Sequence, residues 1–121
     1  MAERRPPAAD PGESAEMRRL RRRIDALDRR IVRLLNERGE LTRDVGRAKT
    51  AAGLRAIRDP EREREVLLRV SMANDGPTPQ ADLLAIFKRL FAVARALERR
   101  DRTRERRAEP FGGPTDPTDR D

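Results

Sequence analysis

The sequence contains no cysteine, histidine, tryptophan or tyrosine, and it has only three phenylalanines among 121 residues. Without thiols or imidazoles the chain cannot form a disulfide, a thiolate nucleophile, an imidazole base or a zinc site of the usual kinds. Any catalysis must therefore rest on carboxylates, lysine, arginine and hydroxyl groups. We accordingly expect no metal and no cofactor.

Long apolar runs are also missing, and the first fifteen residues contain no apolar stretch long enough for a signal peptide or a membrane span. We expect a cytoplasmic protein that does not associate with a membrane. Both ends of the chain are rich in proline, glycine and charged residues and lack helical periodicity. The sequence thus predicts a disordered arm at residues 1–14, a helical domain at 15–105 and a disordered tail at 106–121.

Positive charge is in excess, with 29 Lys or Arg against 22 Asp or Glu and a formal net charge of +7. Residues 20–98 hold 18 of the basic and 12 of the acidic residues, so almost all of the excess lies in the helical domain. A nucleic-acid-binding arm would concentrate this charge in a tail. We expect an anionic partner that is bound by the domain itself.

Apolar residues recur at helical spacing in three segments, and no segment alternates with period two. The first segment is a seam that continues for about four heptads. It consists of Met17, Leu20, Ile24, Leu27, Ile31, Leu34, Leu41, Val45 and Ala48. The pattern predicts an all-α chain with helices at about 14–52, 60–73 and 79–97, the last continuing into the arginine-rich stretch. Gly53 would end the first helix, while Asp-Pro and Thr-Pro pairs would begin the other two.

The first helix would be roughly 50 Å long or more, at about 1.5 Å per residue, and the two shorter helices cannot cover its whole seam. We therefore expect an intertwined homodimer in which the long helices pack together. A monomeric three-helix bundle with a frayed first helix is the alternative.

Two cations occupy unusual places in the first helix. Arg38 stands where the seam requires an apolar residue, and Lys49 lies on the same face within roughly 20° of it. Burying a cation is costly unless it is paired or binds an anion. Arg38 and Lys49 could therefore form a clamp for a small anion.

Charged residues also extend the apolar faces of the other two helices. Asp59 and Glu63 continue the face of the second helix, with Arg62 beside them, and Glu98 continues the face of the third. These positions suggest one polar pocket lined by all three helices. The alternative is a set of buried ion pairs, for example Arg38 with Glu63 and Lys49 with Glu98, that holds a dimer in register.

In order and spacing, several segments between residues 17 and 100 resemble the all-helical chorismate mutases of the AroQ class. The segments are Leu20-Arg21-Arg22-Arg23-Ile24-Asp25-Ala26-Leu27-Asp28, Leu34-Leu35-Asn36-Glu37-Arg38, Val45-Gly46-Arg47-Ala48-Lys49, Arg58-Asp59-Pro60-Glu61-Arg62-Glu63, Asn74-Asp75-Gly76-Pro77 and Ile86-Phe87. The resemblance implies an intertwined homodimer of three-helix chains. It also implies the Claisen rearrangement of chorismate, a small dicarboxylate, to prephenate on the route to phenylalanine and tyrosine.

Site residues follow from the same resemblance. It implies that Arg21, from the partner chain, and Arg38 bind the two substrate carboxylates, and that Lys49 binds a carboxylate and the ether oxygen. It further implies that Arg62 supports the site and that Asp59 and Glu63 hold the region of the substrate hydroxyl. The rearrangement requires no nucleophile, proton transfer or metal, which suits a chain without histidine or cysteine.

The chain departs from the family pattern at two positions. Ala94 stands where the family often has serine, so one hydrogen bond to a carboxylate would be lost. Glu98 stands where the family often has glutamine, and a carboxyl group can donate to the ether oxygen only when it is protonated. We therefore expect Glu98 to be catalytic and activity to rise toward acid pH.

Other functions remain open. An isochorismate pyruvate-lyase or a 4-amino-4-deoxychorismate mutase would use a similar clamp on the same fold. A helical dimer that binds nucleic acid is an alternative of another class, but the chain offers few aromatic residues for base stacking and no recognition helix, so we expect no nucleic-acid partner. Docking to another enzyme of the shikimate pathway is compatible with the sequence.

Overall fold

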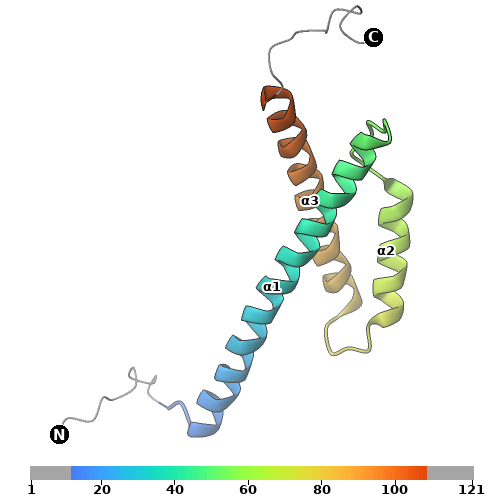
Figure 1. Ribbon diagram of the computed structural model, residues 1–121. Helices are drawn as coiled ribbons and strands as arrows, with labels where there is room; N and C mark the ends of the chain where they lie inside the picture. Colours follow the sequence, from blue (N-terminus) through green and yellow to red (C-terminus); the bar gives the residue numbers. More distant parts are fainter. Residues whose placement is uncertain (1–11, 109–121) are drawn as a thin grey trace, which may run out of the picture. The chain divides into compact units, whose positions relative to one another are not determined.

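The computed structural model describes residues 12–108, which form three α-helices and, within that range, no strand. The helices are α1 (Ala15–Ala51), α2 (Pro60–Ala73) and α3 (Gln80–Ala108), drawn in Figure 1. The all-α prediction is confirmed. Most of the predicted terminal arm and tail, residues 1–11 and 109–121, lies outside the described residues.

Local signals set both ends of α1. The backbone N–H of Met17 donates to the Ser14 hydroxyl over 3.1 Å, so Ser14 caps the first turn. At the other end Gly53 has a φ of +76°, a left-handed conformation in which glycine pays no steric cost. The N–H groups of Gly53 and Leu54 return to the carbonyls of Thr50 and Lys49, over 3.0 and 2.8 Å. This is a Schellman motif, and it ends the helix within one residue of the predicted position.

The start of α2 matches its prediction. Pro60 is the first helical residue, and the Asp59 carboxylate accepts a hydrogen bond of 3.1 Å from the backbone N–H of Arg62. After α2, the Asn74 side chain accepts from the N–H of Gly76 over 2.9 Å and donates to the carbonyl of Thr78 over 3.1 Å. This turn leads the chain back along α2, so α2 and α3 lie side by side (Figure 1).

The ends of α3 differ slightly from the expectation. The helix begins at Gln80, one residue after Pro79, and it continues through the arginine-rich stretch, as expected, to Ala108, three residues beyond the predicted domain boundary at residue 105. Residues 106–108, assigned to a disordered tail from the sequence, are therefore helical. The arginine-rich stretch contains no glycine or proline, so nothing in it stops the helix.

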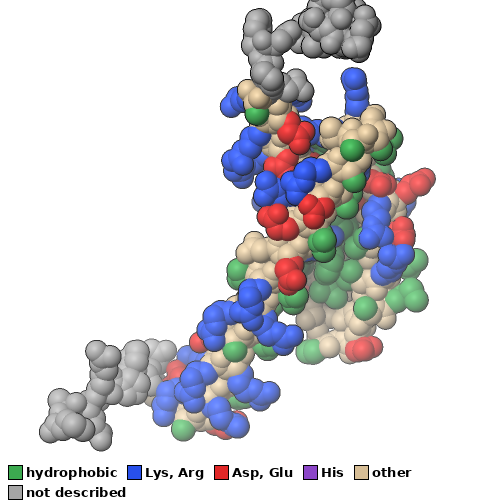
Figure 2. Space-filling view, in the orientation of Figure 1, with side chains coloured by type: hydrophobic (Ala, Val, Ile, Leu, Met, Phe, Trp, Pro, Cys, Tyr) green, Lys and Arg blue, Asp and Glu red, His purple; other side chains and the backbone are tan. Residues whose placement is uncertain are grey.

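The chain divides into two compact units, residues 1–38 and 39–121, with the boundary inside α1. In the second unit the C-terminal part of α1 lies beside α3, because Arg43 bonds to Asp101 and Gly46 adjoins Glu98. Few side chains are fully covered: among the described residues Phe91 is the only buried hydrophobic residue, at 6% exposure. Figure 2 shows hydrophobic side chains gathered over the α2/α3 pair, while side chains of both charges cover α1.

Most of the α1 seam is open to solvent in the single chain. Exposed fractions range from 42% to 64% at Met17, Leu20, Ile24, Leu27, Ile31, Leu34, Leu41 and Val45. Nothing in the described part of the chain is long and apolar enough to form a helix across a bilayer. The exposed seam is the kind of apolar surface that marks an interaction site in soluble proteins.

Candidate active site

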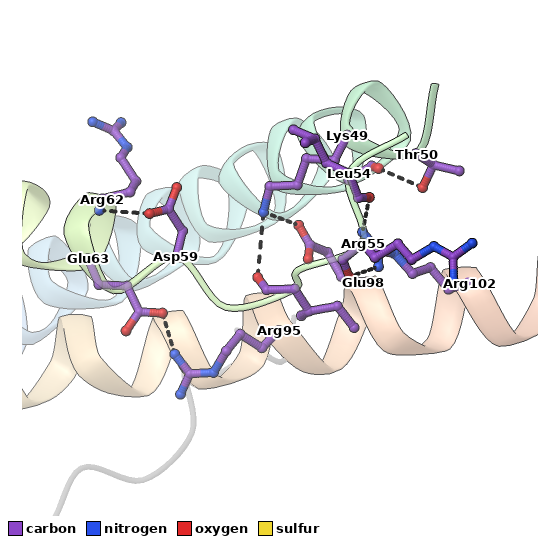
Figure 3. A network of polar contacts seen from close by, with 12 residues as sticks. Lys49, Thr50, Leu54, Arg55, Asp59, Arg62, Glu63, Arg95, Glu98 and Arg102 are labelled. Carbon is purple, nitrogen blue, oxygen red and sulfur yellow. Dashed lines mark hydrogen bonds and ion pairs between the residues drawn. The ribbon is translucent and has the colours of Figure 1, made fainter. Parts of the chain in front are cut away.

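The centre of the candidate site is an ion pair between α1 and α3 (Figure 3). Lys49, in the last turn of α1, places its Nζ 3.3 Å from Oε1 of Glu98 and 3.5 Å from the carbonyl oxygen of Ile57. Glu98 is 4% exposed, and the Lys49 side chain is 19% exposed. The pairing of Lys49 with Glu98, one of the ion pairs considered from the sequence, is therefore present.

The second carboxylate oxygen of Glu98 has a different environment. Oε2 is buried and has no hydrogen-bond partner among the described residues. A buried acceptor without a partner is uncommon in proteins, because losing hydration without replacement costs about 1–3 kcal/mol. Oε2 is thus an unused polar group beside the Lys49 ammonium.

Gly46 allows this placement. It is buried in α1, and a Cβ atom at this position would lie only 3.1 Å from Cγ of Glu98. Glycine therefore lets the Glu98 side chain approach the backbone of α1 one turn before Lys49. Gly46 lies within the Val45–Lys49 motif, and no role was predicted for it, although a glycine inside a helix is itself a signal of close approach.

The start of α2 supplies two more of the predicted residues. The Asp59 carboxylate is the N-cap of the helix, and Glu63 forms an ion pair with Arg95 of α3. The Glu63 and Arg95 side chains are about one-fifth exposed. Arg95 was not singled out from the sequence, but it lies four residues after Phe91 and three before Glu98, which puts it on the same side of α3.

Arg62 lies apart from this group. Its side chain is 55% exposed and pairs with Glu65 over 3.4 Å, and in Figure 3 it extends away from Glu63. In the single chain, Arg62 contributes its backbone N–H to the Asp59 cap. Its predicted supporting role stays a prediction.

Arg21 and Arg38 belong to the other compact unit, residues 1–38. Arg21 is exposed and pairs with Glu13 over 2.7 Å. Arg38 is half-buried near the middle of α1. Their predicted roles at the substrate carboxylates stay predictions.

A cavity of about 560 Å³ adjoins the Lys49 side of the site. Lys49, Asp59, Arg58 and Arg64 contribute to its wall, so cations predominate there. Its volume lies within the range of small-molecule sites, and its charge suits an anion. Over the residues that the structure describes, no cluster of three or more carboxylates could hold a metal ion.

Comparisons with known proteins identify the family of this chain. Residues 20–99 match the sequence profile of the family described as chorismate mutase type II. This chain belongs to the chorismate mutase type II family. The match includes Arg21, Arg38, Lys49 and Glu98, and it confirms the resemblance drawn from the ordered motifs.

Relatives and solved structures of chorismate mutases support the assignment. The chain is 37% identical over 89 residues to a bifunctional chorismate mutase/prephenate dehydratase of Aquifex aeolicus, covering 70% of this chain and 24% of the relative. It is 39% identical over 51 residues to a chorismate mutase of Methanocaldococcus jannaschii, covering 42% of this chain and 50% of that one. A solved chorismate mutase structure from Thermus thermophilus matches with a TM-score of 0.67 and 39% identity, covering 70% of this chain and 96% of that one. The chain spans about a quarter of the length of the bifunctional relatives.

Proposed function

We propose that this chain is a chorismate mutase that converts chorismate to prephenate. The observation that carries the proposal is the ion pair of the buried Glu98 with the part-buried Lys49, with Oε2 of Glu98 left without a partner in the described residues. The family assignment and the lack of histidine and cysteine both favour a reaction that needs positioned charges rather than a nucleophile.

The rearrangement breaks the ether C–O bond of chorismate and forms a C–C bond within the same molecule, so no group enters or leaves. Negative charge develops on the ether oxygen as the C–O bond breaks. The Lys49 ammonium, which pairs with the ionised Glu98 carboxylate in the free chain, stabilises this charge. When Glu98 carries a proton instead, its carboxyl group donates a second hydrogen bond to the same oxygen. Arg38 and Arg21 bind the substrate carboxylates, which holds the reactive compact conformation.

The remaining residues position the substrate. The carboxylates of Asp59 and Glu63 hold the region of the substrate hydroxyl. Arg95 holds the Glu63 carboxylate in place through their ion pair. Arg62 supports this side of the site from the first turn of α2. Ala94 offers no hydroxyl, so binding of one carboxylate depends more heavily on the arginines.

The functional unit of the proposal is a homodimer in which Arg21 comes from the partner chain. The exposed α1 seam supports this, because pairing two chains would remove it from water. Docking to another enzyme of the shikimate pathway and a cytoplasmic location also remain proposals.

A mixing experiment tests the shared site. Arg21→Ala and Arg38→Ala chains, each inactive alone, are mixed under conditions that allow subunit exchange. In a mixed dimer one site regains both arginines, so an equal mixture recovers up to about a quarter of wild-type activity. No recovery in demonstrably mixed dimers would show that Arg21 does not serve the partner's site.

Product identification tests the reaction itself. The purified chain is incubated separately with chorismate, isochorismate and 4-amino-4-deoxychorismate, and products are identified by mass spectrometry. We expect rapid conversion of chorismate to prephenate. Faster release of pyruvate from isochorismate, or faster rearrangement of the amino compound, would assign the chain to one of the alternative activities on the same fold.

A further inference from the structure

A second cavity, larger than the one beside Lys49, is lined by residues between positions 50 and 106. It has a volume of about 840 Å³ and opens between the end of α1, the connection to α2 and the last turns of α3. Leu54 and Arg55 lie between this cavity and the one beside Lys49, because they line both, but neither Lys49 nor Glu98 lines the larger cavity. It includes the arginine-rich end of α3, to which the proposed function assigns no role.

Positive charge dominates the cavity wall. Arg55, Arg99, Arg102 and Arg106 line it, and Glu105 is its one acidic residue. Within residues 12–108 none of these four guanidinium groups forms an ion pair. Figure 2 shows blue side chains gathered over the C-terminal part of α3.

Asp101 precedes Arg102 in the sequence, but its carboxylate is bound by an arginine of another helix. Asp101 receives two hydrogen bonds from Arg43 of α1, over 2.9 and 3.1 Å. Asp101 does not line the cavity. The excess charge of the cavity wall is therefore not offset by this neighbour.

Arg102 makes the wall a built structure rather than a set of loose side chains. Its guanidinium donates to the carbonyl oxygens of Leu54 and Arg55, which ties the α1–α2 connection to α3 (Figure 3). Its Nε–H is buried and has no acceptor in the described part of the chain. Arg102 therefore keeps one hydrogen-bond donor that no described residue uses.

We propose that this cavity binds a small phosphorylated molecule. A phosphate monoester carries a charge of about −1.5 to −2 and three acceptor oxygens, enough to receive bonds from more than one arginine. A single carboxylate has one charge and two oxygens, which one arginine satisfies. Leu54 and Ile57 give the cavity an apolar side for the organic part of the ligand.

Matched probes test the ligand chemistry. Phenyl phosphate, inorganic phosphate and benzoate are titrated into the full chain by isothermal titration calorimetry, and backbone NMR shifts report where each binds. We expect phenyl phosphate to bind most tightly, to bind at least tenfold more tightly than benzoate, and to shift the amides of Thr103 and Arg106, which line this cavity and not the one beside Lys49. Equal binding of benzoate, or no binding of phenyl phosphate, would overturn the proposal.

Matched variants test the location. Arg99→Gln/Arg106→Gln should weaken phenyl phosphate binding at least tenfold. Lys88→Gln/Arg89→Gln removes the same charge from exposed positions of α3 outside the cavity and should change the affinity less than twofold. Equal losses in the two double variants would show only general charge attraction. A loss confined to Lys49→Gln would place the ligand in the active site, and either result overturns the proposal.

Discussion

Glu98 stands at a position where the family often has glutamine, whose amide can donate a hydrogen bond at any pH. Its carboxyl group lies beside the Lys49 ammonium, with one oxygen unpartnered in the described chain. A carboxyl group donates a hydrogen bond only when protonated, whereas an amide donates regardless of pH. We expect kcat/KM for chorismate to rise as pH falls from about 8 to 5, and the Glu98→Gln variant to show a much flatter profile. A wild-type rate that does not change over this range would contradict the role of Glu98.

Two glycines of α1 provide a matched pair of substitutions. At Gly46 a Cβ atom would meet Cγ of Glu98 at 3.1 Å, whereas at Gly39 the nearest atom is Cδ1 of Leu97 at 3.8 Å. Alanine favours a helix interior over glycine by about 0.5–1 kcal/mol. We expect Gly39→Ala to raise the free energy of unfolding by about that amount and to leave activity unchanged.

Gly46→Ala should instead displace Glu98 and lower kcat about tenfold, since small displacements of positioned groups are costly in catalysis. Urea denaturation and steady-state kinetics of both variants check these expectations. Full activity in Gly46→Ala would show that close approach of Glu98 to α1 is not required.

At single residues, the sequence was informative where a charged side chain shared a helix face with apolar ones. Lys49 on the first helix and Glu98 on the third stood out for this reason, and the structure pairs them. Arg95 did not stand out, because it sits in a helix rich in arginine and only its partner on α2 distinguishes it. The spacing of residues within one helix does not show which residues of another helix they contact, because that depends on how the two helices pack.

At the level of helices, Arg43 and Asp101 join α1 to α3 by two parallel hydrogen bonds. The bond from Arg43 lowers the pKa of Asp101 below its usual 3.8, and the nearby charges of Arg43, Arg47 and Arg104 act in the same direction against partial burial. Because the pKa is lowered in the folded state, this stabilisation is present above about pH 4 and is lost as pH falls through the folded-state pKa.

Asp101→Asn should therefore lower the melting temperature by a few degrees at neutral pH. The difference from wild type should shrink and vanish in acid, where the wild-type carboxyl group is also neutral. Thermal unfolding followed by circular dichroism between about pH 2 and 7 measures it. A constant difference over the whole range would mean that the ion pair is not its cause.

The helix ends show which signals are local. Ser14, Gly53 and the Asp59-Pro60 pair act within one turn, so the sequence located these ends to within a residue. The third helix was expected to continue into the arginine-rich stretch, and it does, but the predicted domain boundary at residue 105 lies three residues before its last residue, Ala108. Composition alone is a weaker guide than a cap or a break.

For the whole molecule, the exposed α1 seam leads to the expectation of a dimer. Leu27→Glu places a charge in the seam and should convert the protein to a monomer with little mutase activity, because the partner's Arg21 would no longer be supplied. Ala26→Glu introduces the same charge at the neighbouring position off the seam and should leave a dimer. Light scattering after gel filtration distinguishes the two states, and a dimeric Leu27→Glu would contradict this arrangement.

Substitution of the lysine in the proposed site tests the mutase function. The chain has two lysines: Lys49 pairs with Glu98, and Lys88 is exposed on α3. We predict that wild type and Lys88→Gln convert chorismate to prephenate at similar rates, and that Lys49→Gln lowers kcat/KM by about 10²–10³-fold, as expected for loss of a group that stabilises developing charge. A wild-type rate no faster than the uncatalysed rearrangement, or equal rates in the two variants, would contradict the account.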